Sequence, residues 1–382
     1  MRPFCWLSLF LTAIYFVYGA YTPFWSLWLA ERGLDADQIG LLIGVGLGVR
    51  FIGNLVILGK ANRASLLLPT CRYLAVLSLI AYLGFYWSQD FWALLLLMLL
   101  ANFIYPTLLP LSEALAARMM LQVKLDYGKV RLWGSAAFIL GSTLVGALVQ
   151  HWGASWVLHT MVLGLLLLCG LSWLPMAPAP VDAPASGRRI GFAPLLRDRS
   201  FVMFLLVVCL LQGSHAAYYG FSALYWKAHG YAENVIGYLW ALGVLAEILM
   251  FALSRRLLAG VGYQTLFLIG AAGCLLRWSM LALTTDPLWL ALAQLLHAVT
   301  FCVSHLGAIR YMTQQLPAEQ VIPAQTLYAA LPTGMVMALL TALVGVGYQQ
   351  FQGQVFWAMA LLVLPVFLLR VPPRHSESLR EA

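Results

Sequence analysis

Long apolar stretches alternate with short polar connections along almost the whole chain. An α-helix needs about 20 apolar residues to cross the hydrocarbon layer of a membrane. The pattern predicts twelve such helices, at residues 4–30, 38–59, 65–88, 91–117, 128–150, 155–175, 200–226, 234–254, 263–284, 287–312, 322–348 and 354–370. Four prolines lie deep within these segments and are expected to kink the helices: Pro23, Pro106, Pro110 and Pro332. The pattern therefore predicts an all-α integral membrane protein.

A hairpin of two predicted helices, residues 18–54, recurs in the second half of the chain. The recurrence appears at a shift of 197 positions. The matched pairs include Tyr21 with Tyr218, Gly33 with Gly230, and Gly40 with Gly237. At the same shift Arg50 falls on Glu247, so equivalent depths in the two halves carry opposite charges. A duplicated bundle with a cation in one copy and an acid in the other suggests a transporter.

A segment rich in proline, alanine and arginine separates the sixth predicted helix from the seventh. This composition suits a linker and excludes a membrane helix. We therefore expect an N-terminal six-helix bundle (1–175), a cytoplasmic linker (176–199) and a C-terminal six-helix bundle with a short cytoplasmic tail (200–382).

Composition and charge support the membrane assignment. Hydrophobic residues make up 62% of the chain and charged residues 9%, whereas soluble domains have about 25% charged residues. Eighteen of the 22 basic residues, Arg131 among them, fall at one set of alternate helix ends, and only Arg32 and Lys227 fall at the other. The positive-inside rule then places both termini in the cytoplasm of a bacterial-type inner membrane. The same distribution argues that the net charge of +8 does not serve nucleic-acid binding.

Several stretches resemble one family. LLQGSHAAYYGFSALYW on the seventh predicted helix and LDYGKVRLWGS entering the fifth resemble the phenylpropionate permease branch of the major facilitator superfamily. Further similar stretches are GVRFIG, AEILMFAL, LRWSM and HAVTFCVSHLGAIRYM. The resemblance implies two pseudo-symmetric six-helix bundles and a proton-coupled permease for 3-phenylpropionate or a related aromatic acid. One departure is the loop GKANRAS, which keeps Lys60 and Arg63 but lacks the acid usual after the second helix.

Four ionised residues are predicted to lie within the membrane: Arg50, Glu113, Glu247 and Arg277, with a formal sum of zero. Each costs at least about 2.5–3.5 kcal/mol at mid-bilayer unless it faces a cavity or a partner. They form either two structural ion pairs or a transport site. In the second case Arg50 is the first choice for a substrate carboxylate, because its planar fork binds both oxygens. Arg277 is the second choice, and Asn54, one turn from Arg50, is expected to steer its guanidinium.

Glu247 is the best candidate for a proton carrier, because the proton affinity of a carboxyl group depends on its burial and on nearby cations. One proton entering with one monoanion would then leave the four-residue site neutral. Glu113 is expected to serve as a gate, a local ion-pair partner or a proton acceptor. His215, His297 and His305 are either coupling residues or simple interhelical hydrogen-bonders. The acid, arginine and histidine of helices 8, 9 and 10 also resemble the coupling set of lactose-permease-type symporters.

Aromatic residues on the first and seventh predicted helices are expected to wrap an apolar ring. They are Tyr18, Tyr21, Trp25, Tyr218 and Tyr219. The alternative is that they anchor the helices at the membrane interface, as many Trp and Tyr side chains do.

No cofactor, metal site or obligatory protein partner is predicted. The six cysteines are scattered singly, and no cluster has metal-ligand spacing. Hydrolase and nucleotide-binding motifs are absent, which argues against an enzyme. The prediction is therefore a symporter of an aromatic monocarboxylate and protons, and a drug or metabolite exporter on the same scaffold is the alternative.

Overall fold

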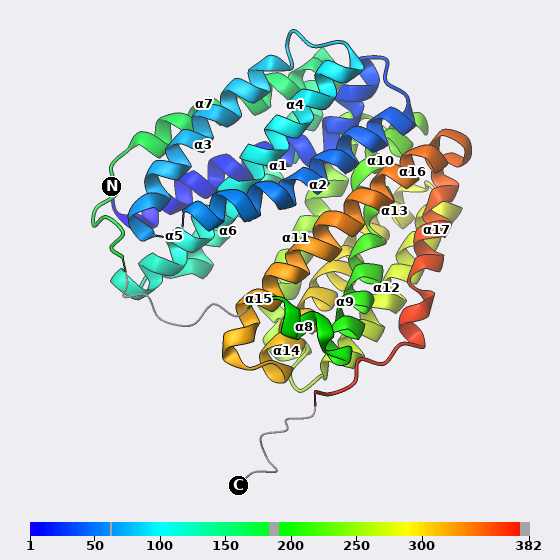
Figure 1. The fold of residues 1–382 in the computed structure, drawn as a ribbon. Helices are drawn as coiled ribbons and strands as arrows, with labels where there is room; N and C mark the ends of the chain where they lie inside the picture. The colour runs from blue at the N-terminus through cyan, green and yellow to red at the C-terminus, as the bar shows by residue number, and fades with distance from the viewer. Residues whose placement is uncertain (62, 183–190, 375–382) are drawn as a thin grey trace.

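The computed structural model describes residues 1–61, 63–182 and 191–374, and helices joined by short turns make up most of them (Figure 1). We call α1 to α7 the N-terminal half. Its helices are α1 (Pro3–Glu31), α2 (Ala36–Lys60), α3 (Ala64–Gly84), α4 (Phe91–Ile104), α5 (Leu108–Val123), α6 (Tyr127–Trp152) and α7 (Ser155–Trp173).

We call α9 to α17 the C-terminal half. Its helices are α9 (Arg199–Gly213), α10 (Ala216–Ala228), α11 (Glu233–Leu257), α12 (Tyr263–Leu283), α13 (Pro287–Leu295), α14 (Ser304–Gln315), α15 (Ala318–Ala330), α16 (Met337–Phe351) and α17 (Val355–Leu362). The short helix α8 (Ala193–Arg197) precedes it and lies within the predicted linker.

Eleven helical stretches of the described chain are long and apolar enough to cross a membrane. The last of these, Ala318–Phe367, has 50 residues. As one helix it would be about 75 Å long, more than twice the hydrocarbon thickness. Gln352 takes a positive φ of 45° between α16 and α17, and the chain reverses there (Figure 1). The described residues therefore contain twelve crossings, and the predicted fold class is confirmed.

Four crossings are interrupted near their middle. Pro106 lies in a 3₁₀ turn, Tyr105–Thr107, between α4 and α5, and Pro332 lies in a π-helical segment, Leu331–Val336, between α15 and α16. A second π segment, Ala298–Val303, joins α13 to α14. His215 lies at the break between α9 and α10. Such breaks are tolerated in a membrane where neighbouring helices or a cavity satisfy the backbone.

The repeated hairpin has the same turn in both copies. Gly33 follows α1 with φ of 81°, and Gly230 follows α10 with φ of 85°. Glycine adopts this left-handed conformation without steric cost, which explains why the residue recurs. In the first copy Asp35 caps α2 by accepting from the backbone N–H of Gln38.

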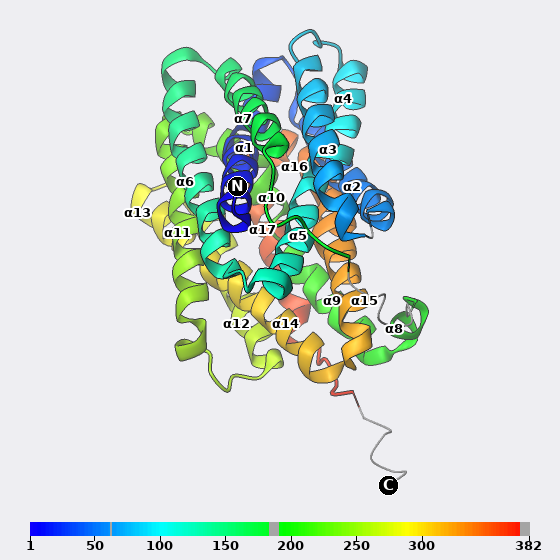
Figure 2. The same ribbon diagram turned by 90° about the vertical axis from the view of Figure 1, so that its left-hand side faces the viewer.

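The two halves lie beside one another and touch mainly through two helix pairs, and α1 also contacts α10 (Figures 1 and 2). Helix α2 packs along α16, and α6 packs along α11. A Cβ atom added at Gly40 would lie 2.7 Å from Cα of Gly345, so only glycine permits this approach. The backbone N–H of Ala36 donates to Oε1 of Gln349 at 3.0 Å, the one hydrogen bond between the halves in the described part of the chain. These contacts close the end of the molecule that carries the α1–α2 turn.

The start of the predicted linker is bound to the N-terminal half, and Figure 2 shows it descending from α7 past α5. Gln122 donates through Nε2 to the carbonyl of Ala179 (2.8 Å) and accepts from the N–H of Val181 (3.1 Å). Asp182 accepts from the backbone N–H and the hydroxyl of Ser65 at 3.2 and 3.0 Å. Positions 183–190 of the linker and 375–382 of the tail lie outside the described residues, and the three-part division remains a prediction.

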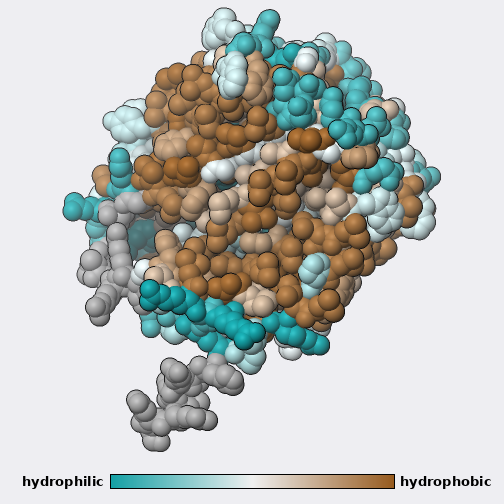
Figure 3. Space-filling view, turned by 45° about the vertical axis from the view of Figure 1, so that its right-hand side comes forward, coloured by the Kyte–Doolittle hydropathy of each residue, from teal (hydrophilic) through white to brown (hydrophobic). Residues whose placement is uncertain are grey.

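Hydrophobic residues form a broad belt across the face of the molecule seen in Figure 3, and hydrophilic residues gather at opposite rims. Many large apolar side chains of the described chain are exposed, for example Leu121 (81%) and Ile322 (74%). A surface of this kind is stable only against lipid.

Candidate functional site

Arg277 on α12 forms the centre of a polar cluster inside the C-terminal half. Its side chain is 0% exposed. One terminal nitrogen donates to Nδ1 of His297 (3.0 Å) and to Oγ1 of Thr300 (3.2 Å), and the other donates to Oε1 of Gln294 (3.4 Å). The guanidinium carbon also lies 4.3 Å from the centre of the Tyr218 ring. Within the described residues no carboxylate pairs with Arg277, so hydrogen-bond acceptors and aromatic faces stabilise its charge.

His297 links this cluster to Glu247. Nε2 of His297 lies 3.7 Å from Oε2 of Glu247, whose side chain is 23% exposed. His215 is bound on the other side: its Nε2 lies 3.1 Å from Oγ1 of Thr300, and its Nδ1 lies 3.1 Å from the carbonyl of Leu211. The sequence-predicted residues that meet here are Glu247, Arg277, His297, His215 and Tyr218.

A cavity of about 160 Å³ lies beside Glu247, between the two halves. The N-terminal half contributes Arg131 to its wall, and the C-terminal half contributes Glu247 and His297. The Arg131 guanidinium carbon lies 4.2 Å from the centre of the Tyr15 ring. Arg131 is also the cation that acts on Glu247 electrostatically. A cation and an acid therefore face one another across the boundary between the halves.

This position adds to the sequence interpretation of Arg131. We counted it with the basic residues at the helix ends, and it does lie in the second turn of α6, but its side chain lines the cavity beside Glu247. One turn further, the hydroxyl of Ser135 accepts from the Arg131 guanidinium at 3.4 Å. Arg131 is therefore a fifth ionised residue of the membrane interior.

Arg50 lines a second cavity, of about 380 Å³. Its other lining residues include Tyr18, Tyr21, Trp25, Asn102, Gln212, Thr333 and Met337. Thr22, Tyr219 and Phe301 line both cavities. The two cavities are therefore adjacent parts of one aromatic space between the halves.

Glu113 on α5 lies near the two interior arginines of the N-terminal half, Arg131 and Arg50. Its side chain is exposed although it stands within a membrane crossing. Arg131 and then Arg50 are the cations that act on it. With Arg131 included, three arginines and two glutamates occupy the membrane interior, so the formal sum is +1 rather than zero.

The remaining predicted residues are distributed more widely. Trp25 donates through Nε1 to the sulfur of Met98 at 3.2 Å. His305 binds the hydroxyl of Tyr328 through Nδ1 at 3.1 Å, away from Glu247. Asn54 lines neither cavity in the described structure, and its Oδ1 is buried without a hydrogen-bond partner.

Sequence reasoning missed Arg131, Asn102, Gln294 and Thr300. The sequence did contain a signal for Gln294 and Thr300. They lie three residues before and three residues after His297, so all three share a helix face. Asn102 lies alone in the apolar stretch of α4, where its Nδ2 donates to the carbonyl of Met98 at 3.0 Å. Its place beside Arg50 depends on how the helices cross.

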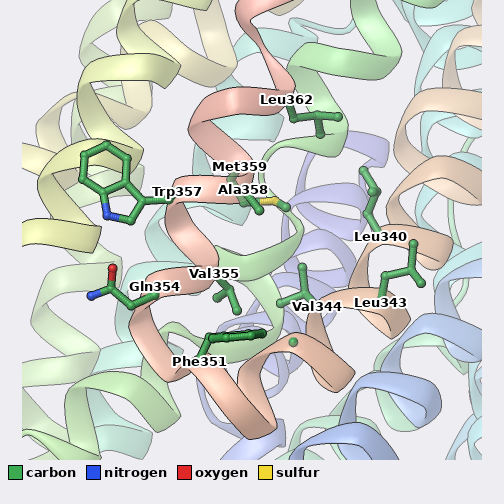
Figure 4. Close-up of a pocket in the computed structure, with 11 residues that line it drawn as sticks. Leu340, Leu343, Val344, Phe351, Gln354, Val355, Trp357, Ala358, Met359 and Leu362 are labelled. Atoms are coloured by element: carbon green, nitrogen blue, oxygen red, sulfur yellow. The ribbon is translucent and has the colours of Figure 1, made fainter.

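A third cavity, of about 550 Å³, lies between α16 and α17 (Figure 4). Its wall is almost entirely apolar, with Leu340, Leu343, Phe351 and Trp357 among its residues and no charged side chain. It offers no group that recognises a carboxylate, so it is not the candidate site. The described residues also contain no group of three or more His, Cys, Asp or Glu placed to hold a metal ion.

Comparison with known proteins agrees with this architecture. The model of the MFS_1-like family matches residues 4–359. The chain belongs to this family. It is therefore a multi-pass membrane transporter of the major facilitator fold and not an enzyme, as the sequence predicted.

Two relatives of this family member match nearly its full length. A protein of Escherichia coli strain K12 described as "Probable 3-phenylpropionic acid transporter" is 42% identical over 367 residues, or 96% of each chain. The maltose permease of Geobacillus stearothermophilus is 26% identical over 375 residues, 96% of this chain and 94% of that one.

Solved structures support the fold. A mutant form of the nucleoside transporter NupG superimposes with a TM-score of 0.82 at 15% identity, covering 96% of this chain and 100% of that one. The D-xylose-proton symporter superimposes with a TM-score of 0.68 at 15% identity, covering 97% and 98%. At these identities the likeness concerns the fold alone.

Proposed function

We propose that this transporter imports an aromatic monocarboxylate of the 3-phenylpropionate class together with protons, by alternating access. The observation that carries the proposal is the aromatic space between the halves, in which Arg50 and Arg131 face the acid Glu247. The E. coli relative, described as a 3-phenylpropionic acid transporter, supports the choice of substrate.

The larger cavity fits the two chemical ends of such a substrate. Its volume of about 380 Å³ falls within the range of about 300–1,000 Å³ usual for small-molecule sites. Tyr18, Tyr21 and Trp25 provide aromatic faces for a phenyl ring. Arg50 provides a fork of donors for the carboxylate. Within the described residues Arg50 has no ion-pair partner, so its fork is available to a ligand.

The charges support an anionic substrate. In the membrane interior the N-terminal half carries Arg50 and Arg131 against the single acid Glu113, so its interior has one excess positive charge. In the interior of the C-terminal half, the charges of Arg277 and Glu247 cancel. One bound monoanion then neutralises the interior with Glu247 ionised. The sequence analysis counted four ionised residues with a sum of zero, so a proton was needed to balance a bound monoanion. Counting Arg131 as well removes that requirement.

Glu247 is the proposed proton carrier. It is the one acid of the C-terminal cluster among the described residues, and its carboxylate borders the cavity that contains Arg131. A carboxyl group in this position is accessible from the cavity and responds to a cation on the other half. Movement of the halves would alter the distance between Arg131 and Glu247 and with it the proton affinity of Glu247.

Direction follows from the proposed topology. If both termini are cytoplasmic, as the basic residues predict, the closed α1–α2 end faces the periplasm. The described conformation then opens inward, and import requires the helix pairs α2–α16 and α6–α11 to separate. The bundles 1–175 and 200–382 are proposed to move as two bodies joined by the linker.

The test is uptake of labelled 3-phenylpropionate into proteoliposomes under an imposed proton gradient, acidic outside. We expect accumulation above the equilibrium level, abolished by a protonophore, with empty liposomes as the control. In Glu247→Gln, gradient-driven accumulation is expected to disappear while substrate counterflow continues. Wild-type accumulation that is insensitive to the protonophore would refute proton coupling.

A further inference from the structure

The hydrogen bonds of the C-terminal cluster fix the proton position on His297. A guanidinium has five N–H donors and no acceptor. Because Arg277 donates to Nδ1 of His297 at 3.0 Å, that nitrogen must carry a lone pair. The single ring proton of a neutral His297 then resides on Nε2. This nitrogen is the one that faces Glu247, at 3.7 Å.

His215 carries a proton on the other ring nitrogen. Its Nδ1 lies 3.1 Å from the carbonyl oxygen of Leu211, which can only accept, so Nδ1 is protonated. Its Nε2 lies 3.1 Å from the hydroxyl of Thr300. That hydroxyl accepts from Arg277 at 3.2 Å and also lies 3.4 Å from the carbonyl of His297, so its one proton is shared between two possible acceptors. Of the two rings, His297 is the one that the contact with Arg277 fixes as neutral.

We propose that His297 is a positioning residue, held by Arg277 as a neutral N–H donor to Glu247, and that Glu247 alone carries the transported proton. The inference rests on the proposed proton-coupled function and assigns the roles within that site. A second proton on His297 would need Nδ1 to release its bond to a buried cation and place two positive groups in contact. The bond from Arg277 also excludes proton transfer through the His297 ring. Nδ1 of His297 is occupied by the Arg277 N–H and has no other acceptor to which it could pass a proton.

The groups around His297 agree with this assignment. The charged and titratable side chains facing the His297–Glu247 pair are Arg277 on α12, His215 and Tyr218 and Tyr219 on the α9–α10 crossing, Cys302 on the π segment and Arg131 on α6. Both arginines are cations that oppose a charge on the ring, and no second carboxylate is among these residues. His297 lies directly before the π segment Ala298–Val303, which sets the ring against Phe301 with 5.4 Å between ring centres.

The proton path that follows is short. Glu247 exchanges its proton with the cavity it lines, and His297 supports the carboxylate from behind. His305 lies two turns further along, beyond Phe301, and binds Tyr328 instead. His297 and His305 therefore hold neighbouring side chains in place, and a proton does not pass from one ring to the other.

The decisive variant is His297→Gln in the full-length transporter. A glutamine amide has an acceptor for Arg277 and a donor for Glu247 but does not titrate. We expect protonophore-sensitive accumulation of 3-phenylpropionate within about twofold of wild type, because the amide keeps an acceptor for Arg277 and an N–H directed at Glu247. The pH profile of uptake should keep its single titration step. His297→Leu removes the hydrogen bond to Arg277 and the polar contact with Glu247 and should shift that step while counterflow persists.

Loss of gradient-driven accumulation in His297→Gln with intact counterflow would overturn the inference and leave the proposed function standing. Absence of gradient-driven accumulation in the wild type would instead refute the proposed function. If His297→Gln does not fold, ¹⁵N spectra of histidine-labelled wild-type protein decide, with His297→Leu to assign the signal. A neutral Nε2–H ring throughout the pH range of transport supports the inference, and a protonated ring overturns it.

Discussion

Replacement of Arg50 by lysine tests whether this residue binds the substrate carboxylate. A bidentate guanidinium makes two charge-assisted hydrogen bonds, and an ammonium group keeps the charge but loses the planar fork. One lost hydrogen bond to a charged group costs about 1.5–3 kcal/mol. We therefore expect the dissociation constant to rise about 10- to 150-fold.

The structure makes this substitution informative. Among described residues Arg50 forms no ion pair, so its loss breaks no buried salt bridge. Arg131 also acts on Glu113 electrostatically, so Glu113 keeps that cation nearby in the variant. Lysine at position 50 also preserves the net charge of the interior. The effect on affinity therefore reports the geometry of carboxylate recognition.

The assay is equilibrium binding of labelled 3-phenylpropionate to purified protein, with Arg131→Lys as the matched control. The neutral amide 3-phenylpropanamide should bind Arg50→Lys and wild type alike, because it has no carboxylate. An unchanged affinity in Arg50→Lys, together with a loss in Arg131→Lys, would refute the assignment and place the carboxylate at Arg131.

Three further outcomes are expected. Gly40→Val should hold the closed end apart, because a Cβ atom there would lie 2.7 Å from the backbone of α16. A cysteine introduced beside the α1–α2 turn should then become more reactive toward a thiol reagent. Gly48→Val should leave the reactivity of that cysteine unchanged, because a Cβ atom at Gly48 has its nearest neighbour at 3.7 Å. Arg277→Met should lower the melting temperature, since each acceptor left unpaired costs about 1–3 kcal/mol, and an unchanged melting temperature would contradict the role of Arg277 in the cluster. Hydrogen bonds from Ser65 hold the pKa of Asp182 below its usual value. The stabilisation is therefore present at neutral pH and lost as the pH falls through the lowered pKa. Asp182→Ala should make the linker more sensitive to protease at pH 7 than wild type, and equal cleavage would exclude the contact.

The fold was largely predictable because the membrane leaves few choices. In lipid every backbone polar group must be satisfied within the segment, so an apolar stretch of sufficient length becomes a helix. The first two segments, predicted at 4–30 and 38–59, agree closely with Pro3–Glu31 and Ala36–Lys60. The repeat of Gly33 at Gly230 was equally informative, because a left-handed turn demands that residue type in both copies.

Interruptions of the helices were predictable only where proline causes them. Pro106 and Pro332 mark the 3₁₀ turn and one π segment, as expected, whereas Pro23 and Pro110 lie inside α1 and α5, which continue past them. The π segment Ala298–Val303 contains no proline, and no local sequence feature announced it. It arises where α13 and α14 pack against α12, a contact between residues distant in sequence.

The candidate site was predictable in its residue types and only partly in its partners. A charged or histidine residue within an apolar helix is costly and therefore conspicuous, which is how Arg277, Glu247 and His297 were found. Arg131 escaped because it stands near a helix end, where basic residues are common. Its position opposite Glu247 depends on the crossing of α6 with α11, and a single helix pattern carries no information about that crossing.

Including Arg131 changes how the two ligands are divided between the halves. The interior of the N-terminal half has two arginines and one acid and therefore one uncompensated positive charge, which suits the substrate anion. The interior of the C-terminal half has one arginine, Arg277, and one acid, Glu247. When Glu247 accepts a proton, Arg277 remains bound by the neutral acceptors His297, Thr300 and Gln294. Thr22, Tyr219 and Phe301 line both cavities. In the proposed mechanism substrate and proton therefore bind to different halves across a shared aromatic wall, and each changes the electrostatic field at the other through Arg131 and Glu247.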